Sequence, residues 1–253
     1  MEFLILGEKI PKTTIQIWDI LSRNNYKSAV WGPMNTNFIN NKNIEIFIPD
    51  PWNHQNKVKP TELNLIYKLA RIYAQNYTDF KIIKNIKYFS NFIYFILKSN
   101  SFIDTIKFLP LFIKIFLQSG LKSYLLFFSF DILSLIFFKN LTKNKNINFS
   151  IIFLNSIAHF QHNNWDQKDL YKNFFILTDY ALKLIFEIYK KYDGVLIYNA
   201  LSQKKIKKQY LLRPLNANNF FIKNGINFKS IHTNMTNGAI ITFKNNIDLK
   251  LNF

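Results

Sequence analysis

The stretch Ile151–Trp165, which reads Ile-Ile-Phe-Leu-Asn-Ser-Ile-Ala-His-Phe-Gln-His-Asn-Asn-Trp, decides the predicted fold of this chain. Its first four residues, Ile151–Leu154, form an apolar run that stops at Asn155. A short apolar run bounded by polar residues is typical of a buried strand. His159 and His162 follow shortly after it. Because open α/β sheets bind ligands at the carboxyl ends of their strands, this stretch predicts a strand with a site directly behind it.

The sequence beyond this stretch predicts a second strand with similar surroundings. Tyr171–Tyr192 is predicted to be a helix, since its leucine, isoleucine and alanine residues recur at the spacing of one helical face. Val195–Tyr198 then reads as a strand, and the polar corner Asn199–Gln203 follows it. A right-handed crossover would make this strand parallel to Ile151–Leu154 and would bring both polar corners to one edge of one sheet.

The first part of the chain shows the same alternation of strands and helices. Ser28–Trp31 and Ile44–Ile48 read as buried strands, and a Pro-Asp-Pro loop follows the second of them. Residues 60–145 are predicted to be a helical insertion that forms a layer or lid, with breaks at Asn100–Ser101, Pro110 and Gly120.

The end of the chain predicts a short helix at Ala217–Lys223, then two strands around an Asn-Gly turn. Together these elements predict the fold class α/β, with a mostly parallel sheet flanked by helices and the helical insertion. Residues 1–253 are expected to form a single domain.

Composition limits the possible classes of function. The 253 residues are 49% hydrophobic and contain no cysteine, so a large core is available and any metal would need His, Asp or Glu ligands. The net charge of +18 would suit a phosphate-rich partner. However, the lysines are spread along the chain, and an AT-rich coding sequence accounts for its many Lys, Asn, Ile and Phe residues. Nucleic acid is therefore not an expected partner, unless the lysines converge on one face.

The sequence favours a cytoplasmic protein that does not contact membranes. Its start lacks the basic head and the long apolar run of a signal peptide. Leu125–Phe138 is the most membrane-like stretch, but it is shorter than the ~20 residues of a spanning helix and contains Asp131. We interpret Ile103–Lys139 as helices packed against one another, and an interfacial membrane helix is the less favoured alternative.

Several motifs occur in an order that resembles a known family. Asn155 to His162, the corner Asn199–Gln203, Tyr210–Arg213 and the Met-Thr pair before the last strand are similar in order to the alkaline phosphatase superfamily. The similarity is to its branch of type I phosphodiesterases and nucleotide pyrophosphatases. The resemblance implies an alkaline-phosphatase-like fold and descent from metal-dependent hydrolases of phosphate or sulfate esters.

The chain departs from the pattern of this family at two places. Family members begin with a strand that carries a metal-binding Asp and a Thr or Ser nucleophile, and no such segment precedes Trp18. We therefore expect an N-terminally incomplete domain, for which a second chain could supply the missing block. The family also has an Asp where this chain has Asn155, and an Asp-His pair where it has Asn199 and Ala200. Because a two-metal site needs anionic ligands, the isolated chain is predicted to be weakly active or inactive.

The resemblance also implies a set of site residues, with zinc or manganese as the cofactor and a small anionic ester or a glycan as the ligand. The residues expected at the metal are Asn155, His159, His162 and His232. The residues expected at the substrate are Gln161, Asn199, Gln203 and Arg213. Two alternatives stay open: the histidines could bond to backbone at a strand end, and Arg213 could form an ordinary surface ion pair.

The sequence leaves two functions open. The first is an alkaline-phosphatase-like domain, a truncated metal-dependent hydrolase of phosphoric esters with little or no activity alone. The second is a non-catalytic binding module that uses the same predicted cleft for a glycan or an anionic ligand. Stoichiometric zinc or manganese in the purified protein would favour the first.

Overall fold

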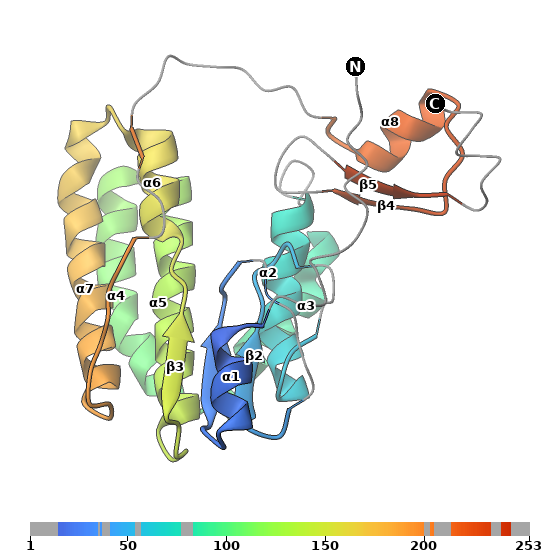
Figure 1. Ribbon diagram of the computed structural model, residues 1–253. Helices are drawn as coiled ribbons and strands as arrows, with labels where there is room; N and C mark the ends of the chain where they lie inside the picture. The colour runs from blue at the N-terminus through green and yellow to red at the C-terminus, as the bar shows by residue number, and fades with distance from the viewer. Residues whose placement is uncertain are drawn as a thin grey trace.

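The computed structural model describes residues 15–34, 36, 41–53, 57–76, 83–199, 203–204, 214–233 and 239–243 (Figure 1). The strands are β1 (Ser28–Trp31), β2 (Ile44–Ile48), β3 (Phe149–Ile152), β4 (Ser230–Thr233) and β5 (Ala239–Thr242). The α-helices are α1 (Ile17–Arg23), α2 (Asn64–Asn76), α3 (Ile86–Lys98), α4 (Phe102–Ser119), α5 (Ser123–Thr142), α6 (Ser156–Asn164), α7 (Tyr171–Tyr189) and α8 (Ala217–Lys223). The fold class is α/β, as the sequence predicted.

The main sheet is parallel and has the order β2-β1-β3. Trp31 at the end of the central strand β1 pairs with Ile48 on one side and with Ile152 on the other. All four residues of β1 are buried, as expected for a parallel strand that is covered on both faces. The three strands therefore end at one shared edge, which we call the carboxyl rim.

Alternate residues of the sheet face two different cores. Ala29 and Trp31 belong to the large core, which the helices of the β2-to-β3 connection and α7 complete. Val30 faces the opposite way and packs with Trp18 of α1 and Phe47 of β2 in a smaller core. The period of two along the strand thus accounts for both layers that cover the sheet.

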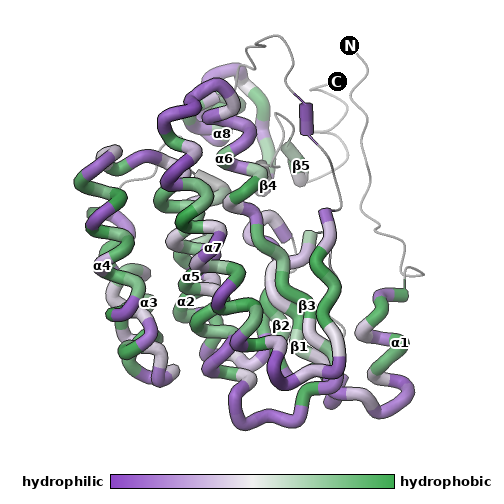
Figure 2. The backbone as a smooth tube through the Cα atoms, turned by 90° about the vertical axis from the view of Figure 1, so that its left-hand side faces the viewer, coloured by the Kyte–Doolittle hydropathy of each residue, from purple (hydrophilic) through white to green (hydrophobic). Residues whose placement is uncertain are grey.

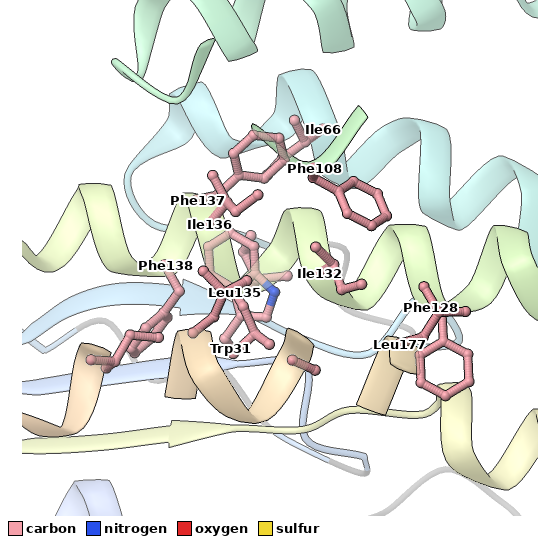
Figure 3. Close-up of a cluster of buried hydrophobic side chains, with 14 of the residues drawn as sticks. Trp31, Ile66, Phe108, Phe128, Ile132, Leu135, Ile136, Phe137, Phe138 and Leu177 are labelled. Carbon is pink, nitrogen blue, oxygen red and sulfur yellow. The ribbon is translucent and has the colours of Figure 1, made fainter. Parts of the chain in front are cut away.

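The large core is centred on α5 (Figure 3). The ring of Phe137 lies edge-on to the rings of Phe92 and Phe95, with centroid distances of 5.7 and 5.2 Å. Phe138 lies edge-on to Trp31 at 6.0 Å, and this contact joins the helix to the sheet. By length and composition α5 could cross a membrane, but 61% of its most apolar window is buried inside the protein. This burial is that of a core helix.

The helices on this side of the sheet form two layers (Figure 2). α2, α5 and α7 lie next to the sheet, and α3 and α4 form an outer layer beyond them. α1 covers the other face of the sheet. On α7, the predicted buried face is observed, because Leu177, Ala181, Leu184 and Ile188 are all buried.

The bounds of strand β3 differ from the prediction. It begins at Phe149, two residues before the predicted start, and ends before Phe153. Its first residue pairs with Ser28, and the N–H groups of Asn148 and Phe149 donate to the carbonyl of Lys27 at 2.9 and 3.1 Å. Pairing with β1 therefore sets the bounds of β3, and the apolar run in the sequence marks them only approximately.

The predicted helix break at Pro110 is wrong, because α4 continues through this residue to Ser119. Pro110 lies on the exposed side of the helix, where the carbonyl of Ile106 can bond to water in place of the missing N–H. The predicted break at Gly120 is confirmed, and this residue adopts a φ of 71° directly after the helix.

The predicted strand at Val195–Tyr198 is also wrong. The segment runs beside β3 and in the same direction (Figures 1 and 2), but it forms no strand, and its side chains are 47–81% exposed. The hydroxyl groups of Tyr192 and Ser150 form a hydrogen bond, so a side chain from the end of α7 contacts β3 where a fourth strand would start to pair. Hydrophobic patterning identified the path of the chain here but not its hydrogen bonding.

The end of the chain follows the prediction more closely. α8 has the predicted bounds, and its N-cap Asn216 accepts a hydrogen bond from the N–H of Asn219 at 2.9 Å. β4 and β5 pair in antiparallel fashion, with Ile231 opposite Ile241. Figure 1 shows this unit beyond the ends of α2 and α3, away from α6.

Candidate functional site at the carboxyl rim

The strand order creates a switch point at the carboxyl rim. The chain leaves β1 to form β2 on one side, and it later returns to form β3 on the other side. Ligands of open α/β sheets bind where neighbouring connections diverge in this way, which here is between the ends of β1 and β3. Gly32 ends β1 with a φ of +78°, and a Cβ atom there would lie 3.3 Å from the carbonyl oxygen of Phe153. A glycine thus permits the close approach of the two strand ends.

Asp131 of α5 fixes the start of α6 at this switch point. Its Oδ2 accepts hydrogen bonds from the N–H groups of Asn155 at 2.8 Å and Ser156 at 2.7 Å. The carboxyl group therefore caps α6 from a neighbouring helix, at the end where the helix dipole favours a negative charge. Burial raises the pKa of Asp131 to about 6, although these hydrogen bonds act in the opposite direction.

The two candidate histidines lie on α6. The ring of His159 is half-buried and stacks on Phe127 of α5, with a centroid distance of 3.6 Å and an interplanar angle of 4°. Burial lowers the pKa of His159, and the nearby His162 lowers it further, so the neutral imidazole is favoured near pH 7. His162 lies one turn further along the helix and is exposed. The pair therefore presents one stacked ring and one accessible ring.

A distant part of the sequence reaches this pair. Nε2 of Gln203 lies 3.4 Å from Nε2 of His162. Gln203 follows the segment that runs beside β3, so two residues 41 positions apart in the sequence meet at the last turn of α6. The Gln203 amide and the His162 imidazole both have N–H donors, so together they can donate hydrogen bonds to an anionic oxygen.

The other predicted site residues are placed as follows. Asn155 is the N-cap of α6, and Gln161 is a half-buried residue between the two histidines. Asn199 is exposed at the end of the segment beside β3. His232 belongs to β4, which Figure 1 separates from α6, and its side chain lies outside the described residues. Arg213 also lies outside the described residues.

Zinc or manganese does not fit the donors that the described residues provide. Within the part of the chain that the structure describes, no three His, Asp or Glu side chains come together as a metal site. His159 and His162 supply two imidazoles, and Asn155 could supply only a neutral amide. Two neutral imidazoles and a neutral amide, with no carboxylate, are insufficient for the two-cation chemistry that the resemblance implies.

A second polar group lies at the other end of the rim, after β2. The hydroxyl group of Tyr67 donates to the carbonyl of Asp50 at 3.1 Å. The guanidinium group of Arg71 donates to the carbonyl of Asn53 and, at 3.3 Å, to the hydroxyl of Tyr67. Burial raises the pKa of Tyr67. These contacts hold the Pro-Asp-Pro loop against α2, at the end of the rim away from the switch point.

Asp131 and the Tyr67–Arg71 pair were missed as rim residues. A signal for Asp131 was present, because it is the one acidic residue in the 20 residues of α5. Its role depends on the packing of α5 against the start of α6, which the sequence does not state. Tyr67 and Arg71 are four residues apart on a helix, a spacing that brings side chains together.

A comparison with known proteins gives no relative for this chain. No protein family, curated protein or solved structure matches it.

Proposed function

We propose that this chain is an alkaline-phosphatase-like α/β domain that binds a phosphate- or sulfate-like group at its carboxyl rim and does not hydrolyse esters by itself. The observation that carries the proposal is the 3.4 Å approach of Gln203 to His162 in the last turn of α6, the helix that follows β3. The order of the motifs and the parallel order β2-β1-β3 are consistent with the resemblance. The anion would accept hydrogen bonds from the exposed imidazole and the amide.

The binding part of the proposal predicts a local loss of affinity for inorganic phosphate. Because hydrogen bonds to a charged group are stronger than neutral ones, His162→Ala and Gln203→Ala should each weaken phosphate binding by about tenfold. Isothermal titration calorimetry with sodium phosphate at constant ionic strength measures this change.

Gln167→Ala is the matched control, because Gln167 is an exposed glutamine beyond the end of α6. This variant should bind phosphate like the parent chain. Equal affinities for all four proteins would place phosphate binding elsewhere, and the absence of binding by the parent chain would remove the proposal.

The second part of the proposal predicts that the isolated chain does not turn over a phosphodiester. Bis(p-nitrophenyl) phosphate with added zinc or manganese should be hydrolysed no faster than in the metal-containing buffer. The physical reason is that Asn155 stands where the resemblance requires a carboxylate, and no nucleophile has been identified. Absorbance of the released p-nitrophenolate measures the rate. Steady turnover that His159→Ala abolishes would contradict this prediction.

A further inference from the structure

The outer layer of helices leaves an apolar surface uncovered. On α4, apolar side chains recur at steps of four, three, four and three residues, and each of them is 39–49% exposed: Phe102, Ile106, Leu109, Ile113 and Phe116. The opposite side of the same helix buries Phe108 and Ile115 against the core. Exposed apolar side chains gathered on one side of a helix mark an interaction site, and the part of the chain that the structure describes covers only the other side of α4.

The neighbouring helix continues this surface. Ile86, Ile93 and Leu97 of α3 are 66%, 60% and 55% exposed, at a spacing that puts them on one side of the helix. Figure 2 shows α3 and α4 together as the outermost layer, on the far side of α2, α5 and α7 from the sheet. We call these exposed residues of α3 and α4 the outer apolar surface.

Lysines border this surface in a regular way. Lys107 and Lys114 directly follow Ile106 and Ile113, and all four side chains are exposed. On α3, Lys87 and Lys98 directly follow Ile86 and Leu97 in the same manner. Each lysine therefore lies beside an exposed apolar residue, where its long stem can cover apolar atoms while its ammonium group stays in water.

The charged residues of this layer are almost all positive. Between residues 83 and 122 the chain has six lysines and one acidic residue, Asp104. The carboxylate of Asp104 forms ion pairs with the ammonium groups of Lys139 of α5, at 2.8 Å, and of Lys107, at 3.4 Å. The outer layer is thus both apolar and strongly basic.

This combination decides between the possible partners. A second copy of the chain would cover the apolar atoms, but it would bring two basic surfaces together within a chain whose net charge is +18. An anionic lipid surface accepts apolar side chains at the level of its acyl chains and attracts the lysines that border them. We propose that the outer apolar surface docks this protein onto anionic membranes, as a peripheral contact without a spanning helix. This inference does not depend on the function proposed for the rim.

Vesicle binding by the full chain tests the proposal. The chain should sediment with vesicles of phosphatidylcholine and phosphatidylglycerol in a ratio of roughly 7:3, in which about a third of the lipid is anionic. It should not sediment with vesicles of phosphatidylcholine alone. Lys87→Glu with Lys114→Glu should weaken this binding by about thirtyfold or more, since each lysine near an anionic surface contributes to the attraction. The control exchange is Lys172→Glu with Lys183→Glu on α7, which also reverses two exposed charges. This control should retain most of the binding.

A fluorescent label gives a readout that is independent of folding defects. Because the chain has no cysteine, Ile113→Cys and Phe186→Cys each create one labelling site, the second at an exposed apolar position of α7. An environment-sensitive dye at residue 113 should shift to the blue on addition of the 7:3 vesicles, and the dye at residue 186 should not. Equal shifts at both positions or no shift at either would overturn the proposal. A blue shift at residue 113 without vesicles, together with a dimeric mass by light scattering, would also overturn it and would assign the surface to a second copy.

Discussion

Replacement of Phe160 by alanine is expected to lower the free energy of unfolding by about 3–5 kcal/mol. Phe160 is fully buried, and it holds α6 to the core between the two candidate histidines. Its ring lies 4.4 Å from that of Phe174 and edge-on to those of Tyr124 at 5.6 Å and Tyr171 at 5.3 Å. These neighbours come from two other helices, so they cannot all move to fill the space that the ring leaves. Urea unfolding followed by circular dichroism measures the change.

Ile157→Ala on the same helix is the matched control, because this side chain is 38% exposed. It should cost clearly less than Phe160→Ala, since less apolar area returns to water. Similar losses in the two variants would mean that Phe160 does not anchor α6.

The replacement Asp131→Asn is expected to change the pH dependence of stability. The pKa of Asp131 is about 6 in the folded chain, against an ordinary value of 3.8, so the native state holds the proton more tightly than the unfolded state. Its contribution to stability is fully present below about pH 4 and is lost as the pH rises through about 6. Asparagine does not titrate, so the variant should gain roughly 3 kcal/mol relative to the parent chain between pH 4 and pH 7. Urea unfolding of both proteins across this range gives the difference.

Asp104→Asn is a control of the opposite sign. Burial raises the pKa of Asp104, but the ammonium group of Lys139 at 2.8 Å outweighs this effect and lowers it overall. Asp104 therefore stabilises the fold above its ordinary pKa and loses this contribution as the pH falls. Relative to the parent chain, this variant should lose stability as the pH rises. A constant difference between Asp131→Asn and the parent chain over the whole pH range would contradict the raised pKa of Asp131.

The parts of the fold that the sequence predicted are those in which local signals agree. β1 and β2 have their predicted bounds because each apolar run is closed at once by Gly32 or by Pro49, which end strands by their backbone geometry. α8 and the β4–β5 pair were predicted because Gly225 after the helix and the Asn-Gly pair between the strands both act over a few residues.

The failures concern contacts between distant segments. Val195–Tyr198 has the composition of a strand, but a strand also needs a backbone partner, and the sequence does not specify one. Similarly, the apolar residues of α4 predicted a helix packed inside the protein, and one side of this helix is exposed. Hydrophobic periodicity does not show which sides of a helix its neighbours cover. The uncovered side of α4 carries the membrane inference, although the sequence favoured no membrane partner.

The candidate site was predictable in part. The crossover rule was applied to Val195–Tyr198 as a parallel strand, and this segment forms none, so of that prediction only the contact of Gln203 with His162 is observed. The stacking of His159 on Phe127 and the capping by Asp131 depend on how α5 lies against α6, which no local pattern encodes.

The imidazole nitrogens provide the most direct test of the proposed anion site. Long-range proton–nitrogen NMR spectra, assigned with single-histidine variants, should be recorded while inorganic phosphate is added to the intact chain at constant pH. We expect the signals of His162 and His159 to shift with a common saturation curve, and those of His232, on β4 away from α6, to keep their positions. If the signals of His162 and His159 stay unchanged, or if all histidines shift alike, the rim does not bind the anion and the proposed function is wrong.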